Sequence, residues 1–188
     1  MRFVGAFSYG TIADRRRHNS EIKFALSNSY RYDFFREDIK LIARVPTPCI
    51  GVCSTGIGDS VCRGCKRYAH EVIHWNGYSE EQKCAINLRL DQLLSQIVGA
   101  KLSVFDCMLL ERRLQAQQIR YSAHKSPLVW VFELLRAGAS QIDDPRAFGF
   151  ALELEYRNLS LPALREQIDS EFFLLSEAHY QRYIATIV

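Results

Sequence analysis

Four cysteines fall within seventeen residues of this chain, at Cys49, Cys53, Cys62 and Cys65. A C-x3-C pair is followed, after eight residues, by a C-x2-C pair. The surrounding segment 46–65 is rich in glycine, and its sizeable apolar side chains are only Ile50, Val52, Ile57 and Val61. Burial of so few apolar groups cannot order the loop, so a cross-link such as a bound metal has to supply the stability. The pattern therefore predicts that the four sulfur atoms converge on one metal centre.

Three chemistries compete for these cysteines. Four thiolates at uneven spacing suit an iron–sulfur cluster, whereas structural Zn²⁺ usually takes two short cysteine pairs on a longer linker than the eight residues found here. A redox dithiol at Cys62 and Cys65 would need a βαβ context that the chain lacks. Because soft thiolate ligands do not choose between iron–sulfur and zinc, both remain open and the dithiol ranks behind them.

The residues around the cysteines favour thiolate ligands. Arg44, Arg63, Lys66 and Arg67 would offset part of the negative charge of four thiolates and lower the thiol pKa values. Glycines at 51, 56, 58 and 64 permit tight turns in which backbone amides donate to sulfur.

The stretch also resembles a known family. PCIGVC, then CRGC, then Trp75 and a Ser-Glu-Glu-Gln helix start at Ser79 agree in order and spacing with the Domain of Unknown Function 1289 family. The resemblance covers residues 46–94, about a quarter of the chain. Members of that family are commonly described as predicted iron–sulfur proteins. The resemblance therefore implies a cluster ligated by Cys49, Cys53, Cys62 and Cys65, but it implies no reaction.

The length of 188 residues, with 48% hydrophobic and 24% charged residues, suits one or two compact domains. We expect three regions: a basic N-terminal arm over 1–44 that is either disordered or packed on the rest, a four-cysteine metal-binding domain over 45–98, and a helical C-terminal region over 99–188. The net charge of +3 arises in the arm, which has nine Lys and Arg against five Asp and Glu.

The N-terminal arm contains Arg15, Arg16 and Arg17 in succession. Clustered cations bind nucleic-acid phosphates, so these three arginines are candidate RNA contacts, although three arginines without interleaved aromatic residues are more typical of a solvated tail. The sequence shows neither a secretory segment nor a membrane span. With six cysteines, the chain is expected to work in a reducing compartment, the cytoplasm.

The chain is predicted to be mainly α, with a small four-cysteine metal-binding loop followed by a helical C-terminal bundle. Helical periodicity and caps predict helices over 66–75, 80–98, 102–120 and 127–137. The stretch 148–156 reads as strand or helix. Two short helices are predicted over 162–169 and 176–184, on either side of the apolar run 172–175.

The other residues with metal-binding, redox or stacking side chains have simpler interpretations. His70 and His74, one helical turn apart, are expected to line a solvated face rather than bind a metal. Cys84 and Cys107 are expected to be small apolar side chains, and Trp75 is expected to be a core anchor. The sequence thus predicts an iron–sulfur protein that serves as an electron-transfer or accessory component with a protein redox partner. The alternative is a zinc-stabilised interaction or RNA-binding module.

Overall fold

The computed structural model describes residues 44–185 of the chain. The described residues from Pro46 onward belong to one compact unit. The predicted N-terminal arm lies outside the described residues, except for its last residue, Arg44. In the described part the fold is mainly α, as predicted. Its helices and strands are α2 (Ala69–Ile73), α3 (Glu80–Gly99), β1 (Leu102–Val104), α4 (Cys107–Ala116), α5 (Pro127–Gly138), β2 (Phe150–Leu152) and α6 (Leu161–Tyr183). Short 3-10 turns connect them, at Thr55–Ile57, Trp75–Gly77, Ala139–Gln141, Pro145–Phe148 and Leu154–Tyr156.

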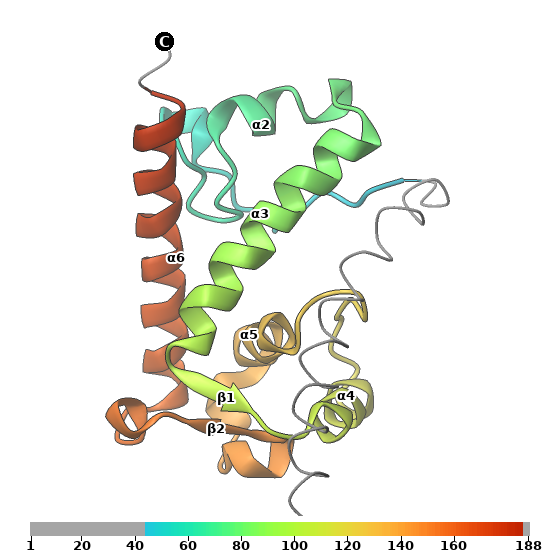
Figure 1. Ribbon diagram of the computed structural model, residues 1–188, viewed down its shortest axis with the longest axis vertical. Coiled ribbons are helices and arrows are strands. Elements are labelled where there is room, and N and C mark those ends of the chain that lie inside the picture. Colours follow the sequence, from blue (N-terminus) through green and yellow to red (C-terminus); the bar gives the residue numbers. More distant parts are fainter. Residues whose placement is uncertain (1–43, 186–188) are drawn as a thin grey trace, which may run out of the picture. The chain divides into compact units, whose positions relative to one another are not determined.

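Helices α3, α5 and α6 pack against one another and make the core (Figure 1). The buried face of α3 is an apolar stripe at helical spacing, and it meets an α5 that is apolar nearly all round. The buried side chains that these three helices contribute are Leu90, Leu93, Leu94, Ile97, Val98, Val129, Trp130, Val131, Phe132, Leu134, Leu135, Leu161, Leu164, Ile168 and Phe172. Burial of such side chains is the main favourable contribution to folding. The predicted boundary between residues 98 and 99 falls within the last turn of α3, which ends at Gly99, and thus inside the compact unit.

The helix starts follow the predicted caps. Ser79 accepts a hydrogen bond from the Gln82 backbone, and the Gln82 side chain accepts one from the Ser79 backbone, which completes a capping box at α3. Ser126 caps α5, with Pro127 in its first turn. Asp144 accepts from the Arg146 backbone at the turn that begins with Pro145.

A short strand replaces the start of the helix predicted over 102–120, and its partner strand lies within 148–156, the stretch that reads as strand or helix. The prediction of helix over 102–120 is wrong at its beginning, because Leu102–Val104 pairs antiparallel with Phe150–Leu152 and the helix begins only at Cys107. Phe105 and Asp106 both donate backbone hydrogen bonds to the Gly149 carbonyl, which closes the end of the ribbon. A partner strand almost fifty residues away leaves no local signal at Leu102.

The prediction of two short C-terminal helices is also wrong. Residues 161–183 form one continuous helix, α6, whose buried face follows Leu161, Leu164, Ile168, Phe172 and Ser176. The apolar run 172–175 does not interrupt the helix, since its side chains turn to different sides and Leu174 is exposed. In Figure 1, α6 runs the length of the folded unit beside α3, from the strands to the cysteine loop.

The helix predicted over 66–75 is shorter than expected. Lys66 has a positive φ of 60°, and Val61 and Tyr68 form an antiparallel bridge, so the helix cannot begin before Ala69. No described helix is both long enough and apolar enough to span a membrane.

The capping box of α3 gives a first test. Removing the Ser79 hydroxyl in Ser79→Ala leaves the Gln82 backbone N–H without its acceptor, and we expect the free energy of unfolding to fall by about 1 kcal/mol. Ser79→Asp supplies a carboxylate acceptor in the same place and is expected to retain wild-type stability. Urea denaturation followed by circular dichroism measures both, and equal stability of the alanine and aspartate variants would contradict this assignment.

Candidate metal centre

The second cysteine pair lies on a tight, hydrogen-bonded turn. The Cys62 backbone N–H donates to the Arg67 carbonyl and the Lys66 N–H to the Cys62 carbonyl, both at 2.8 Å. The bridge between Val61 and Tyr68 closes the base of this turn. We refer to residues 61–68 as the cysteine turn.

The side chains of Cys62 and Cys65 lie within hydrogen-bonding reach of each other and are almost fully buried, with 1% and 7% of their residue surface exposed. Burial opposes ionisation of Cys62, but hydrogen bonds from the backbone of Cys65, Ser54 and Gly64, and from the Cys65 side chain, outweigh it. Together they lower the pKa of Cys62 to about 7. For Cys65, burial raises the pKa, against the opposing influence of the Arg67 side chain. The turn thus favours a thiolate at Cys62.

The loop that carries the first cysteine pair lies directly on this turn. The protonated Cys62 thiol donates to the Val52 carbonyl at 3.7 Å, and the Arg63 backbone N–H donates to the Ser54 hydroxyl at 2.8 Å. Gly64 makes the approach possible, because a Cβ at this position would lie 2.2 Å from the Val52 carbonyl oxygen. The residues on both sides of Cys53 are therefore fixed against the turn that holds Cys62 and Cys65.

Cys49 and Cys53 themselves are exposed, and the Sγ of Cys53 lies 3.1 Å from the Thr55 hydroxyl oxygen. Over residues 44–185, no group of three or more histidine, cysteine, aspartate or glutamate side chains is arranged to hold a metal ion. The structure thus assembles one of the two predicted pairs and brings the backbone of the other beside it. The four-thiol ligand set stays a prediction.

The cations of the cysteine turn have separate partners. Arg63 pairs with Asp59 at 2.8 Å and is largely exposed. Lys66 is 2% exposed, with its Nζ 2.5 Å from Asp169 on α6 and 5.6 Å from the centre of the Phe172 ring. Arg67 donates from Nε to the Cys65 sulfur at 3.3 Å. Of the predicted cations around the site, Arg67 is therefore the one whose side chain touches a cysteine sulfur.

Helix α6 anchors the cysteine turn to the core, and sequence reasoning missed this role. Besides Asp169 and Phe172, α6 supplies Phe173, whose ring lies 5.2 Å from the Arg63 guanidinium, and Tyr180, whose ring packs 5.3 Å from that of Tyr68. Asp169 lies 103 residues from Lys66, so no local pattern could have indicated the contact.

The remaining candidates have structural positions. Trp75 is buried, as expected of a core anchor. His74 is exposed and His70 half-buried, with its ring 5.7 Å from that of Tyr68. Arg15, Arg16 and Arg17 lie outside the described residues, so their proposed RNA contacts stay a prediction.

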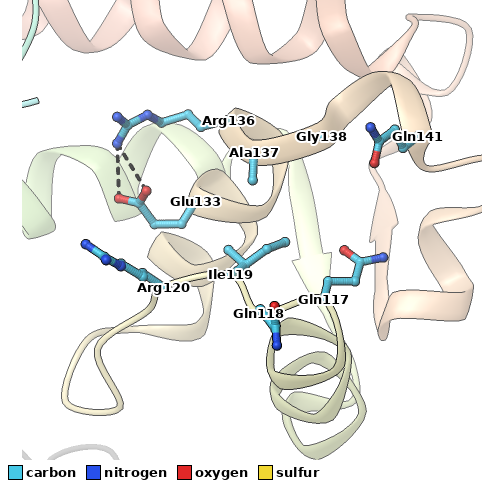
Figure 2. Close-up of a pocket in the computed structure, with 9 residues that line it drawn as sticks. All are labelled: Gln117, Gln118, Ile119, Arg120, Glu133, Arg136, Ala137, Gly138 and Gln141. Carbon is cyan, nitrogen blue, oxygen red and sulfur yellow. Dashed lines mark hydrogen bonds and ion pairs between the residues drawn. The ribbon is translucent and has the colours of Figure 1, made fainter.

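Two hollows lie on the surface of the described residues, one beside the cysteine turn and one beside α5. A small one, of about 90 Å³, adjoins Cys65 and is lined by three ion pairs, Lys66–Asp169, Lys125–Asp91 and Arg136–Glu133. A larger and open hollow, of about 690 Å³, lies where the segment after α4 meets the end of α5, and none of its described lining residues is a cysteine (Figure 2). Each cation of the small hollow already has a carboxylate partner.

Comparison with known proteins adds one result. Residues 47–94 match the model of the family described as Protein of unknown function (DUF1289). The match covers all four cysteines, α2 and most of α3, about a quarter of the chain, and it confirms the predicted resemblance over 46–94. No curated protein and no solved structure matches the chain.

The close approach at Gly64 predicts a sharp difference between two glycines. Gly64→Ala places a Cβ against a backbone oxygen that can move only if the loop lifts off the turn, so we expect thermal unfolding at a lower temperature and a loss of about 1–3 kcal/mol. Gly56→Ala, in the same loop, meets nothing within 4 Å and is expected to change little. Differential scanning calorimetry compares them, and an equal shift in both variants would refute the close approach.

The Lys66–Asp169 pair predicts that α6 stabilises the turn. Asp169→Asn keeps the size of the side chain but leaves the buried ammonium without a countercharge, and we expect the free energy of unfolding to fall by about 1–3 kcal/mol. Glu166→Gln on the same helix removes an exposed carboxylate paired with the exposed Arg165 and is expected to cost less than about 0.5 kcal/mol. Guanidinium denaturation that shows no difference between the two variants would contradict this role.

Proposed function

We propose that the protein binds an iron–sulfur cluster through Cys49, Cys53, Cys62 and Cys65 and acts as an electron-transfer or accessory component. The observation that carries the proposal is the cysteine turn, in which two nearly buried thiols lie within hydrogen-bonding reach of each other, with backbone N–H donors and a guanidinium around them. Thiolates with such donors are the ligands that iron–sulfur clusters take. When bound, the cluster supplies one-electron transfer.

The first pair completes the ligand set in this proposal. Contacts at Val52 and Ser54 hold the chain on both sides of Cys53 against the cysteine turn. The Cys53 side chain is exposed, so a rotation about its own bonds changes its direction without unfolding the loop. Cys49 lies in the same loop, also exposed.

A redox dithiol at Cys62 and Cys65 is a less suitable function for this geometry. A pKa near 7 at Cys62 resembles that of reactive thiols, but reactive thiols are partly exposed so that a partner sulfur can reach them. Both sulfur-bearing residues here are almost fully buried. Enclosed thiols suit a metal centre better than thiol exchange.

Zn²⁺ at the same four cysteines is the alternative, since a tetrahedral four-thiolate site serves either metal. In that case the metal stabilises an interaction or RNA-binding module. We place the protein in the cytoplasm in either case, because a reducing compartment keeps thiols available for metal. For the iron–sulfur protein, a protein redox partner would meet the loop at its exposed apolar side chains, Ile50, Val52 and Ile57.

Metal analysis of protein purified without oxygen tests the proposal. We expect a brown protein that contains iron and acid-labile sulfide, with a broad visible absorption that dithionite bleaches. A colourless protein with one equivalent of zinc would contradict the iron–sulfur cluster and support the zinc site instead. A protein that holds neither metal after reconstitution with iron and sulfide, or with zinc, would refute the metal centre.

Single cysteine variants test the ligand set. Cys62→Ser is expected to abolish metal retention and to destabilise residues 46–75, because metal binding contributes to the folding of such loops. Cys49→Ser and Cys53→Ser are expected to lose most of the metal. Cys84→Ser, on α3, is the matched control and should retain it. Equal metal content in Cys62→Ser and Cys84→Ser, measured by plasma mass spectrometry, would contradict the assignment.

A further inference from the structure

Arg67 is buried immediately beside Cys65, and its surroundings suit a role in the metal centre. Only 3% of its surface is exposed. Its guanidinium carbon lies 4.7 Å from the centre of the Trp75 ring, and its Nε–H donates to the Cys65 sulfur at 3.3 Å. The guanidinium is thus held between an aromatic face and a cysteine sulfur.

One end of this guanidinium has no acceptor. The Nη1 atom of Arg67 is buried and has no hydrogen-bond partner among the described residues. An unsatisfied charged donor inside a protein costs free energy, because water no longer solvates it. Stacking on Trp75 compensates for part of this cost, but it provides no hydrogen-bond acceptor for Nη1.

Among residues 44–185, no carboxylate forms an ion pair with Arg67 either. Lys66 has Asp169, and Arg63 has Asp59, each within 2.8 Å. The structure gives Arg67 a cysteine sulfur and an aromatic ring instead. Buried cations are normally paired with an anion. When a metal is bound, the anion next to Arg67 is the Cys65 thiolate.

We propose that Arg67 is a positioning residue of the metal centre, which fixes the Cys65 sulfur through Nε and compensates the negative charge of the bound thiolates with its buried cation. The inference rests on the proposed function, whichever of the two metals is bound. Arg67 is a donor to a ligand, and not itself a ligand. Groups of this kind orient metal ligands and tune the metal's affinity and potential.

The expected effects follow from charge. Loss of the cation leaves the loaded site more negative, so the metal is held less tightly. In a cluster, reduction adds one more negative charge. Loss of Arg67 therefore makes the reduced state less favourable and moves the midpoint potential to a more negative value.

The test compares full-length Arg67→Gln and Arg67→Lys with Arg63→Gln. Arg63 is the matched control, since it is an arginine of the same turn whose side chain pairs with Asp59 and not with sulfur. Each protein is reconstituted without oxygen with iron and sulfide, or with zinc. The readouts are the rate of metal loss to excess chelator, the midpoint potential of the cluster form, and the thermal unfolding midpoint.

We expect Arg67→Gln to weaken metal affinity about 10- to 100-fold, which the chelator detects as faster release, and to shift the potential to a more negative value. Arg67→Lys keeps the charge but not the planar donor geometry, so its release rate and potential should lie between those of Arg67→Gln and the wild type. Arg63→Gln should change the release rate and the potential far less, because the Arg63 side chain is largely exposed and pairs with Asp59. If Arg67→Gln does not fold, Trp75→Phe replaces it, because this variant retains the cation but gives it a smaller ring to stack on. Its metal release should also be faster and its potential more negative than in the wild type, but by smaller amounts.

Release rates and potentials of the Arg67 variants that equal those of Arg63→Gln, in a wild type that holds metal, would overturn the inference and leave the proposed function standing. A wild type that holds no metal would overturn both.

Discussion

The burial of the cysteine turn against α6 is the constraint on which the rest of the site depends. Two cations, Lys66 and Arg67, follow Cys65 directly and both are buried. A buried cation needs a partner, and the two partners are of different kinds. Lys66 reaches Asp169 on α6, whereas Arg67 reaches the Cys65 sulfur and the Trp75 ring. One cation therefore ties the turn to the core, and the other faces the thiols.

The contact between Lys66 and Asp169 gives the C-terminal helix α6 a structural role at the cysteine turn. The family match ends at residue 94, yet the turn within it packs on side chains of α6, Asp169, Phe172, Phe173 and Tyr180. Segment 46–65 has few apolar side chains of its own, and α6 supplies the surface on which the cysteine turn packs. The helical region thus acts as a support for the cysteine turn.

Much of the helical framework was predictable because its signals are local. The α3 stripe, the capping box at Ser79 and the Ser126–Pro127 helix start each lie within a few residues and have one simple structural meaning. The strand Leu102–Val104 was missed, and residues 148–156 stayed open between strand and helix, because three residues are too few to show alternation and the pairing joins residues far apart in the sequence. The continuity of α6 was missed because its polar residues and its apolar run hide a buried stripe that only the packing on α3 and α5 reveals.

The sequence by itself determined which residues are candidate ligands, since cysteine spacing, nearby glycines and flanking cations are properties of adjacent positions. It also determined the family resemblance of this segment, which the family model confirms. Only the tertiary structure decided that Cys62 and Cys65 are buried together and that the Val52 backbone packs directly against Gly64. It also decided that Arg67, rather than Arg63, donates a hydrogen bond to a cysteine sulfur. The reason is physical: burial and charge pairing depend on which distant helix covers a turn, and no local pattern specifies that helix.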